Sequence, residues 1–183
     1  MPLTMGLFVY VDNSNVWIEG GRISAVAKGY APDLLTAMTD KVLDYGWKYD
    51  FGRLYELACP EGEKIGRSAL FGSRPPANDS LWHRAREEGF EVIVHDRNAS
   101  NREKKVDVHI ATMMMEDSFV YMQAGRDTAV LIAGDGDYVP TVESLQRRNI
   151  PVRLMFWSHA SHELRGTCDS FVVLDPHLDF LAR

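Results

Sequence analysis

The chain has 183 residues, of which 45% are hydrophobic, 25% charged and 10% aromatic. This length corresponds to about one domain, and the composition is typical of a globular protein with a sizeable buried core, which excludes disordered and fibrous classes. The net charge of −6 argues against a protein that coats nucleic acid through bulk electrostatics, but it is compatible with a nuclease that concentrates basic residues near its site.

The sequence gives no indication of a membrane or secreted protein. Its longest apolar stretches, Ala129–Ala133 and Phe171–Leu174, are far shorter than the ~20 residues of a membrane-spanning helix. The N-terminal segment has no basic region before its apolar residues, so we expect no signal peptide and a cytoplasmic location. Cys59 and Cys168 are too few for a disulfide framework and are expected to be buried, reduced thiols.

Six short runs of apolar, β-branched or aromatic residues predict strands. Several of them show little polar alternation, which is typical of strands covered on both faces in a parallel sheet. The predicted strands are Leu7–Val11, Phe51–Cys59, Phe90–His95, Thr128–Ala133, Pro151–Trp157 and Phe171–Leu174.

Helical patterns alternate with these runs. Asp33 and Asn78 stand where N-caps are expected. Two connections that contain glycine and proline, Gly20–Pro32 and Pro60–Ala77, are predicted to be long loops, which usually shape or cover a site. The predicted helices are Pro32–Tyr45, Asp79–Glu88, Lys105–Gln123 and Tyr138–Arg148, with a shorter one around His159–Arg165.

Alternation of strands and helices without a linker or internal repeat predicts a single domain over residues 1–183, with a core of about 7–174. Because parallel strands are joined by right-handed crossovers, the expected fold is an open three-layer α/β fold with a central, mostly parallel sheet flanked by helices.

Acidic residues follow two of the predicted strands. Asp12 ends the first strand, and Asp135 and Asp137 follow the fourth. In doubly wound sheets these two strands are commonly neighbours at the point where strand order reverses, and ligands bind in the crevice there. Asp107 opens the long helix that leaves the third strand, so we expect all four carboxylates to converge at one edge of the sheet.

Four converging carboxylates repel one another and raise one another's pKa unless a cation compensates them. Their oxygen atoms suit Mg²⁺ or Mn²⁺ better than zinc, for which His or Cys ligands are expected. Such a site fits metal-assisted hydrolysis of a phosphodiester, and Asn15 could orient a carboxylate or the substrate through its amide.

Each acidic residue also has a purely structural interpretation. Asp12 could cap a turn, Asp137 could be the N-cap of the following helix, and Asp107 could interact with the helix dipole. Asp135 is harder to explain in this way, because the glycines on either side of it suggest that a ligand approaches the backbone closely.

Three segments resemble the NYN domains of the PIN-like nuclease superfamily: Val11–Val16, Lys105–Val108 and Leu131–Tyr138. Their order and spacing also match, and the resemblance extends over about residues 7–174. It implies a PIN-like (Rossmannoid) fold, RNA as the substrate and metal-dependent ribonuclease activity. The acidic site that it implies consists of Asp12, Asp107, Asp135 and Asp137, with Asn15 matching an amide of the first motif.

Ala133 departs from the pattern, because many relatives have a Ser or Thr there with a hydroxyl that can serve the site. Members of the family also differ in whether they are active. A non-catalytic RNA-binding or regulatory module with the same pocket is therefore the main alternative to a ribonuclease. A phosphatase with an Asp nucleophile after the first strand is a third possibility.

Basic residues immediately before Asp107 could bind the phosphates of RNA, although a solvated loop is an equally good interpretation. Trp17 and Trp82 could each stack on a base, but core packing is the favoured interpretation for both. An exposed sheet edge would also allow a homodimer. The predicted substrate-binding residues are Arg97, Arg102, Lys104 and Lys105 before Asp107, and Arg74 in the Pro60–Ala77 connection.

Overall fold

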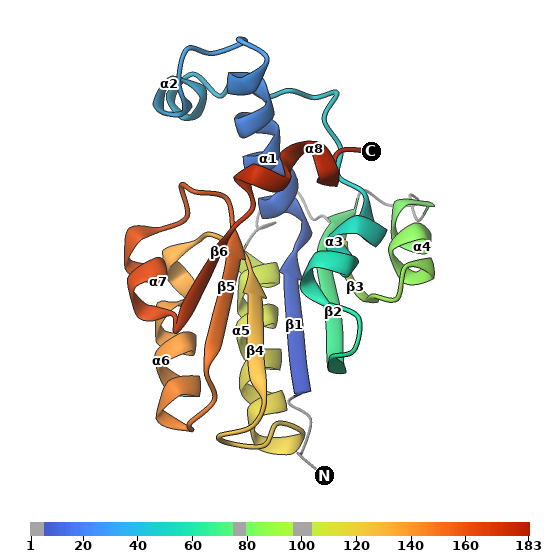
Figure 1. Cartoon of the computed structure of the whole chain (residues 1–183), viewed down its shortest axis with the longest axis vertical. Helices are drawn as coiled ribbons and strands as arrows, with labels where there is room; N and C mark the ends of the chain where they lie inside the picture. Colours follow the sequence, from blue (N-terminus) through green and yellow to red (C-terminus); the bar gives the residue numbers. More distant parts are fainter. Residues whose placement is uncertain (1–5, 75–79, 97–103) are drawn as a thin grey trace.

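The computed structural model describes residues 6–74, 80–96 and 104–183. They form an α/β fold around one six-stranded sheet, in which every neighbouring pair of strands is parallel and the order is β3-β2-β1-β4-β5-β6 (Figure 1). The predicted fold class is confirmed. The strands are β1 (Gly6–Asp12), β2 (Lys64–Arg74), β3 (Glu91–Asp96), β4 (Thr128–Ile132), β5 (Val152–Phe156) and β6 (Ser170–Val173).

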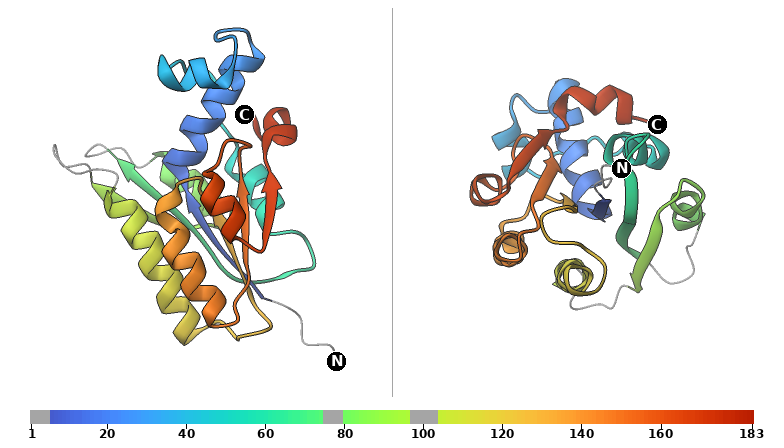
Figure 2. Two further views of the ribbon diagram at one scale, coloured as in Figure 1. Left: turned by 90° about the vertical axis from the view of Figure 1, so that its left-hand side faces the viewer. Right: turned by 60° about the horizontal axis from the view of Figure 1, so that its bottom comes forward.

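Helices cover both faces of the sheet. α5 and α6 lie on one face, and α3 and α8 lie on the other (Figure 2). α1 begins at the end of β1 and extends beyond the sheet towards α2 (Figure 1). The helices are α1 (Asn13–Ala27), α2 (Leu34–Thr39), α3 (Phe51–Ala58), α4 (Ser80–Glu87), α5 (Lys104–Val120), α6 (Val139–Arg147), α7 (His162–Thr167) and α8 (Leu178–Leu181), with 3₁₀ helices η1 (Gly136–Tyr138) and η2 (Asp175–His177).

β1 is the centre of the core, and all seven of its residues are buried. β4 is also buried along its whole length, and it pairs with β1 in parallel, with Val11 opposite Ile132. The sequence prediction that the first and fourth strands are neighbours is therefore confirmed. Strand order reverses between them, which places the segments after both strands at the same edge of the sheet.

The second predicted strand is wrong. Phe51–Cys59 forms helix α3, because Phe51, Leu54 and Ala58 recur at helical spacing and are buried on one face, and Asp50 caps its first turn. The real second strand, β2, lies within Pro60–Ala77, which was predicted to be a loop. Gly66 and Gly72 weaken the strand pattern, but a Cβ at either position would collide with the ring of Phe8 or Trp82.

The predicted loop Gly20–Pro32 is also wrong in its first half, because α1 continues to Ala27. Gly20 is required there by packing: a Cβ on it would lie 2.4 Å from the Trp47 ring. The predicted helix Pro32–Tyr45 is shorter than expected, although Asp33 caps it as predicted. The other predicted helices and strands are confirmed to within a few residues.

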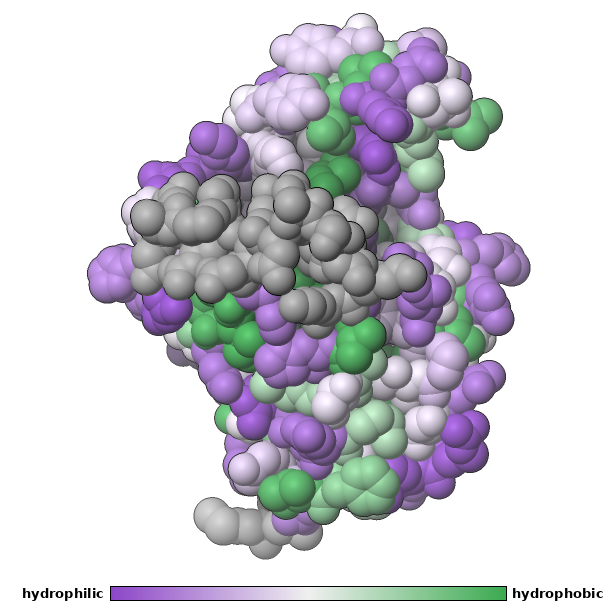
Figure 3. Space-filling view, turned by 180° about the vertical axis from the view of Figure 1, so that it is seen from behind, coloured by the Kyte–Doolittle hydropathy of each residue, from purple (hydrophilic) through white to green (hydrophobic). Residues whose placement is uncertain are grey.

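On the side of the molecule where α5 covers the sheet, hydrophilic and hydrophobic side chains alternate on the surface (Figure 3). Phe119, Val120 and Tyr121, at the end of α5, are among the exposed large hydrophobic residues. Within the residues that the structure describes, no helix combines the length and apolar character needed to cross a bilayer. Both cysteines are free thiols; Cys59 is buried and Cys168 is half-buried.

Candidate active site

Asp12 is the last residue of β1 and is only 6% exposed. It is also the N-cap of α1, because its Oδ1 accepts a hydrogen bond from the backbone N–H of Asn15 at 3.1 Å and another from the Ser14 hydroxyl at 3.0 Å. The capping interpretation is therefore correct, but both bonds use Oδ1 and neither uses Oδ2. The cap fixes the carboxyl group at the carboxyl edge of the sheet, and neither capping bond occupies Oδ2.

Asp107, in the first turn of α5, lies against Asp12, and the two carboxyl groups are close enough to share a hydrogen bond. Burial, and then the charge of Asp12, raise the pKa of Asp107 to about 7. Burial likewise raises the pKa of Asp12, although its hydrogen bonds oppose this effect. The two carboxyl groups therefore form an interacting pair at the carboxyl edge of the sheet.

Asp135 follows β4 and completes the local acidic environment. It is exposed, and its Oδ1 accepts a hydrogen bond from the backbone N–H of Asp137 at 3.1 Å at the start of η1. Its charge contributes to the raised pKa values of Asp107 and Tyr138. The structure therefore brings Asp12, Asp107 and Asp135 into one electrostatic neighbourhood.

Asp137 is exposed in η1. Its interpretation as the N-cap of the next helix is wrong, because Tyr138 holds the N-cap position of α6 and no side chain caps it. The capping side chain in this turn is instead Asp135, which caps η1. Asp137 is therefore free of the structural task that would otherwise have explained it.

Asn15 joins the two halves of the site. Its Oδ1 accepts a hydrogen bond of 2.7 Å from the backbone N–H of Gly134, in the loop that carries Asp135. Asn15 therefore positions this loop against the start of α1. Gly134 also has a packing reason to be glycine, because a Cβ there would lie 2.1 Å from the ring of Phe156.

Tyr138 is a residue of the site that sequence reasoning missed. Its buried hydroxyl donates a hydrogen bond of 3.2 Å to Oδ1 of Asp107. Burial, and then the charges of Asp12 and Asp107, raise the pKa of Tyr138, so the group stays a neutral donor. Its position directly after the Gly-Asp-Gly-Asp motif, at the start of a helix, is the signal that could have identified it.

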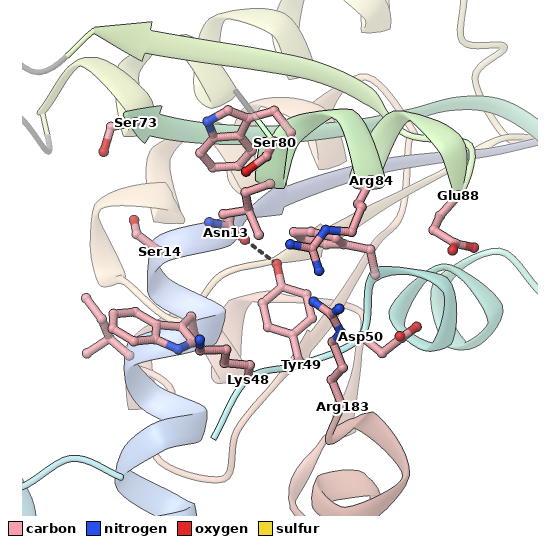
Figure 4. Close-up of a pocket in the computed structure, with 15 residues that line it drawn as sticks. Asn13, Ser14, Lys48, Tyr49, Asp50, Ser73, Ser80, Arg84, Glu88 and Arg183 are labelled. Atoms are coloured by element: carbon pink, nitrogen blue, oxygen red, sulfur yellow. Dashed lines mark hydrogen bonds between the residues drawn. The ribbon is translucent and has the colours of Figure 1, made fainter. Parts of the chain in front are cut away.

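A cavity of about 630 Å³ opens beside this acidic neighbourhood, with Asn13 and Ser14 on its wall (Figure 4). Trp82, in α4, lines it but is buried, as the core interpretation predicted. Trp17, in α1, is half-buried and also lines it. Sequence reasoning did not identify the cavity, because its other walls come from α3, α4 and the last residue of the chain.

The predicted substrate-binding residues are not placed by the structure. Arg97 and Arg102 lie outside the described residues, and so do the side chains of Arg74, Lys104 and Lys105. Among the parts of the chain that are described, no group of three or more His, Cys, Asp or Glu residues is arranged to hold a metal ion. The compact element of the site is the pair of carboxyl groups, with a third nearby.

Comparisons with known proteins identify the family and the fold of the chain. The family model described as NYN domain, a domain of the PIN-like nuclease superfamily, matches residues 9–175. A crystal structure of a protein of unknown function from Vibrio parahaemolyticus is similar over 100% of this chain and 99% of that one, with a TM-score of 0.71 and 20% sequence identity. At that identity the similarity shows a shared fold. No match was found among curated proteins.

Proposed function

The chain belongs to the NYN domain family of the PIN-like nuclease superfamily, and on this premise we propose that it is a metal-dependent ribonuclease. Its substrate is single-stranded or flexible RNA, and it acts as an endonuclease. The observation that carries the proposal is the contact between Asp12 and Asp107 at the strand-order reversal, where burial and mutual repulsion raise the pKa of Asp107 to about 7. Perturbed carboxyl groups in such a crevice are typical of functional sites.

The donor chemistry of the site fits Mg²⁺ or Mn²⁺. Asp12 and Asp107 offer closely spaced carboxylate oxygens, and Asp135 adds a third carboxylate within electrostatic reach. Mg²⁺ is commonly held by one or two carboxylates together with substrate phosphates and water, so a closed protein cage is not required. We assign Asp12, Asp107, Asp135 and the exposed Asp137 as the residues that would hold the ion. When bound, it would activate a water molecule and polarise the scissile phosphate.

The remaining residues of the site fix these carboxylates in place. Ser14 and the N–H of Asn15 orient Oδ1 of Asp12, and the Tyr138 hydroxyl orients Oδ1 of Asp107. Asn15 also holds the loop of Asp135 through Gly134. Rigid placement of this kind is needed because a cleavage site works only when its ligands are held close to their productive geometry.

The basic segment before Asp107 remains our candidate for the phosphates that flank the cleaved bond. Arg97, Arg102, Lys104 and Lys105 in that segment, together with Arg74 from the Pro60–Ala77 connection, would neutralise these phosphates. Because exposed phosphate contacts are strongly screened, RNA affinity should fall steeply with salt. A cytoplasmic location and a homodimer stay predictions from the sequence.

The test is incubation of purified protein with end-labelled single-stranded RNA in Mg²⁺ or Mn²⁺, with EDTA and Asp135→Asn as controls. Asp135 is exposed, so its replacement should leave the fold intact. The proposal predicts cleavage that needs the metal and is lost in the variant. Cleavage by the variant at the wild-type rate would indicate a contaminating nuclease. RNA binding without any cleavage would instead favour the non-catalytic module.

A further inference from the structure

The cavity of about 630 Å³ beside the site is built from several separate parts of the chain. The start of α1 supplies one wall, α4 supplies another, and the segment from Lys48 to Phe51 with Arg183 closes it (Figure 4). The backbone N–H of Arg183 donates a hydrogen bond of 2.8 Å to the carbonyl of Lys48, which holds the last residue against this segment. Cavities of 300–1,000 Å³ are of the size that binds small molecules.

The cavity lies next to the carboxylate pair, although none of the four acidic residues of the site lines it. Asn13 and Ser14 line it, and they follow Asp12 in the chain. The Ser14 hydroxyl bonds Oδ1 of Asp12 at 3.0 Å, and the Tyr49 hydroxyl donates a hydrogen bond to Oδ1 of Asn13 (Figure 4). A group held in the cavity is therefore next to the place where a scissile phosphate would lie.

Aromatic residues form much of the cavity wall. Tyr49, Phe51 and Trp82 are buried there, whereas Trp17 is half-buried. The indole N–H of Trp17 donates a hydrogen bond of 3.1 Å to the carbonyl of Trp47, which fixes the orientation of the ring. A fixed, partly exposed indole is suited to stack on a nucleobase, because every base offers a π-face.

Cationic side chains point into the same space. Arg84, from α4, and Arg183, from the C-terminal segment, both extend towards Tyr49, and Lys48 lies on the rim (Figure 4). Within the described part of the chain, none of the ion pairs includes any of these three residues. Two converging guanidinium groups that lack carboxylate partners favour an anion between them.

Two carboxylates also line the cavity, and one of them already has a structural partner. Oδ1 of Asp50 accepts a hydrogen bond of 3.0 Å from the backbone N–H of Arg53 and caps α3. Glu88 lies at the far end of α4, next to Gly52. The side chains that line the cavity therefore include three cations, Lys48, Arg84 and Arg183, and two carboxylates, Asp50 and Glu88.

We propose that this cavity binds one unpaired nucleotide of the RNA substrate, with its base against Trp17 and a phosphate between Arg84 and Arg183. The inference rests on the proposed function, since it takes RNA to be the substrate. It adds a basis for selectivity: a base paired in a duplex cannot enter the cavity, so the chain acts on unpaired RNA. Stacking on an indole does not distinguish one base from another, so little base preference is expected.

The first test measures binding without cleavage. The whole chain is titrated in EDTA with adenosine 5′-monophosphate, adenosine and inorganic phosphate by isothermal calorimetry. The proposal predicts that the monophosphate binds more tightly than either of the other two. Arg84→Gln should weaken its binding by about tenfold, because a hydrogen bond to a charged group is lost. Arg86→Gln, on the same helix but not lining the cavity, is the matched control and should bind as the wild type does.

A second variant tests the aromatic wall. Trp17→Leu keeps an apolar side chain but removes the stacking surface. It should therefore weaken the binding of adenosine 5′-monophosphate and leave the binding of inorganic phosphate unchanged. Arg84 is exposed, so its variant reports on the cavity even if Trp17→Leu fails to fold. Absence of monophosphate binding, equal binding by Arg84→Gln and wild type, or phosphate binding as tightly as the monophosphate would each overturn the proposal.

Cleavage then separates this inference from the proposed function. With single-stranded RNA, Arg84→Gln should raise KM several-fold and leave kcat largely unchanged, because the residue binds a flanking nucleotide. If the monophosphate binds in a manner that depends on Arg84 but the chain does not cleave RNA, the proposed nucleotide site stands and the proposed ribonuclease activity is rejected. Cleavage with an unchanged KM in Arg84→Gln would retain the ribonuclease and reject the nucleotide site.

Discussion

Buried carboxyl groups lie at both ends of the sheet, and the protein shifts their pKa values in opposite directions. At the amino end, Asp127 is 2% exposed and accepts hydrogen bonds from the backbone N–H groups of Gly6 and Gln123 and from Arg126. These bonds hold the pKa of Asp127 below its ordinary value. At the carboxyl end, Asp12 is similarly buried but faces Asp107, and the pKa values of both are raised.

The difference shows that burial alone does not identify a functional carboxylate. Asp127 is fully partnered and connects the start of β1 to the segment before β4, which is a structural task. Asp12 and Asp107 are held next to each other at a cost in folding free energy, because burial raises the pKa of both carboxyl groups and the charge of Asp12 raises that of Asp107 further. A fold that keeps such an unfavourable pair of carboxyl groups is typical of a functional site, where a bound ligand removes the unfavourable free energy.

The largest expected effect is loss of activity in Asp12→Asn. The amide can still accept the hydrogen bonds that cap α1, but it removes a charge from the proposed metal site. We expect cleavage to fall by at least about 100-fold, with a melting temperature in EDTA that is equal to or above that of the wild type. Cleavage assays and thermal melts of the same preparation measure both. A stable variant with full activity would show that Asp12 is only a cap.

Asp127→Asn should give the reverse result. The neutral amide is a poorer acceptor for two backbone N–H groups and loses the contact with Arg126, so we expect a loss of about 2–3 kcal/mol in unfolding free energy. Because the pKa of Asp127 is lowered in the fold, the stability it contributes is present above about pH 4 and is lost on acidification through its folded pKa. Denaturant unfolding at pH 7 measures the loss. Cleavage per folded molecule should be unchanged, and a selective loss of activity would contradict the comparison.

A smaller effect is expected for Asn15→Ala, which removes the acceptor for Gly134 but no charge. Since a half-buried backbone N–H is left without its partner, we expect a loss of about 1 kcal/mol in stability and of about tenfold in kcat. KM should stay unchanged, because Asn15 positions a loop and does not bind substrate in this scheme. Wild-type kcat in a variant with lowered stability would assign Asn15 a structural task alone.

The sequence predicts the acidic site better than it predicts the elements around it. Asp12 and Asp135 follow strands whose apolar runs, Leu7–Val11 and Thr128–Ala133, leave little ambiguity, and parallel topology then brings both to one edge. Geometry that depends on contacts across the fold is not visible in the sequence. The bond between Asn15 and Gly134 joins residues that are 119 positions apart.

The first half of the fold is harder to predict because tertiary packing overrides the local pattern there. Gly20, Gly66 and Gly72 suggest loops or breaks, yet each lies inside a regular element at a place where an aromatic ring occupies the space of a Cβ. The cavity depends on these elements, because Phe51 in α3 and Ser73 in β2 line it. The sequence predicts a strand in place of α3 and a loop in place of β2, so the cavity could not be predicted from it. Its cations, Arg84 and Arg183, are consequently residues that no sequence pattern connects to Asp12.

The smallest expected effect sharpens the comparison through pH. Burial and the charge of Asp12 raise the pKa of Asp107 from 3.8 to about 7, so the folded state binds more protons than the unfolded state between these values. Its stability in EDTA therefore falls as the pH rises through this window. Asp107→Asn removes the titration, and we expect its melting temperature to exceed that of the wild type by about 2–4 °C at pH 8, with a smaller difference at pH 5.

Addition of Mn²⁺ completes the test of this last variant. A cation at the site should raise the melting temperature of the wild type at pH 8, because it binds the folded state and compensates the charged pair. Mn²⁺ should raise the melting temperature of Asp107→Asn much less. The difference in melting temperature between the two proteins should therefore become smaller or change sign in Mn²⁺. A variant that is less stable than the wild type in EDTA at both pH values would show that Asp107, like Asp127, is held by favourable partners. The contrast between the two ends of the sheet would then have another origin.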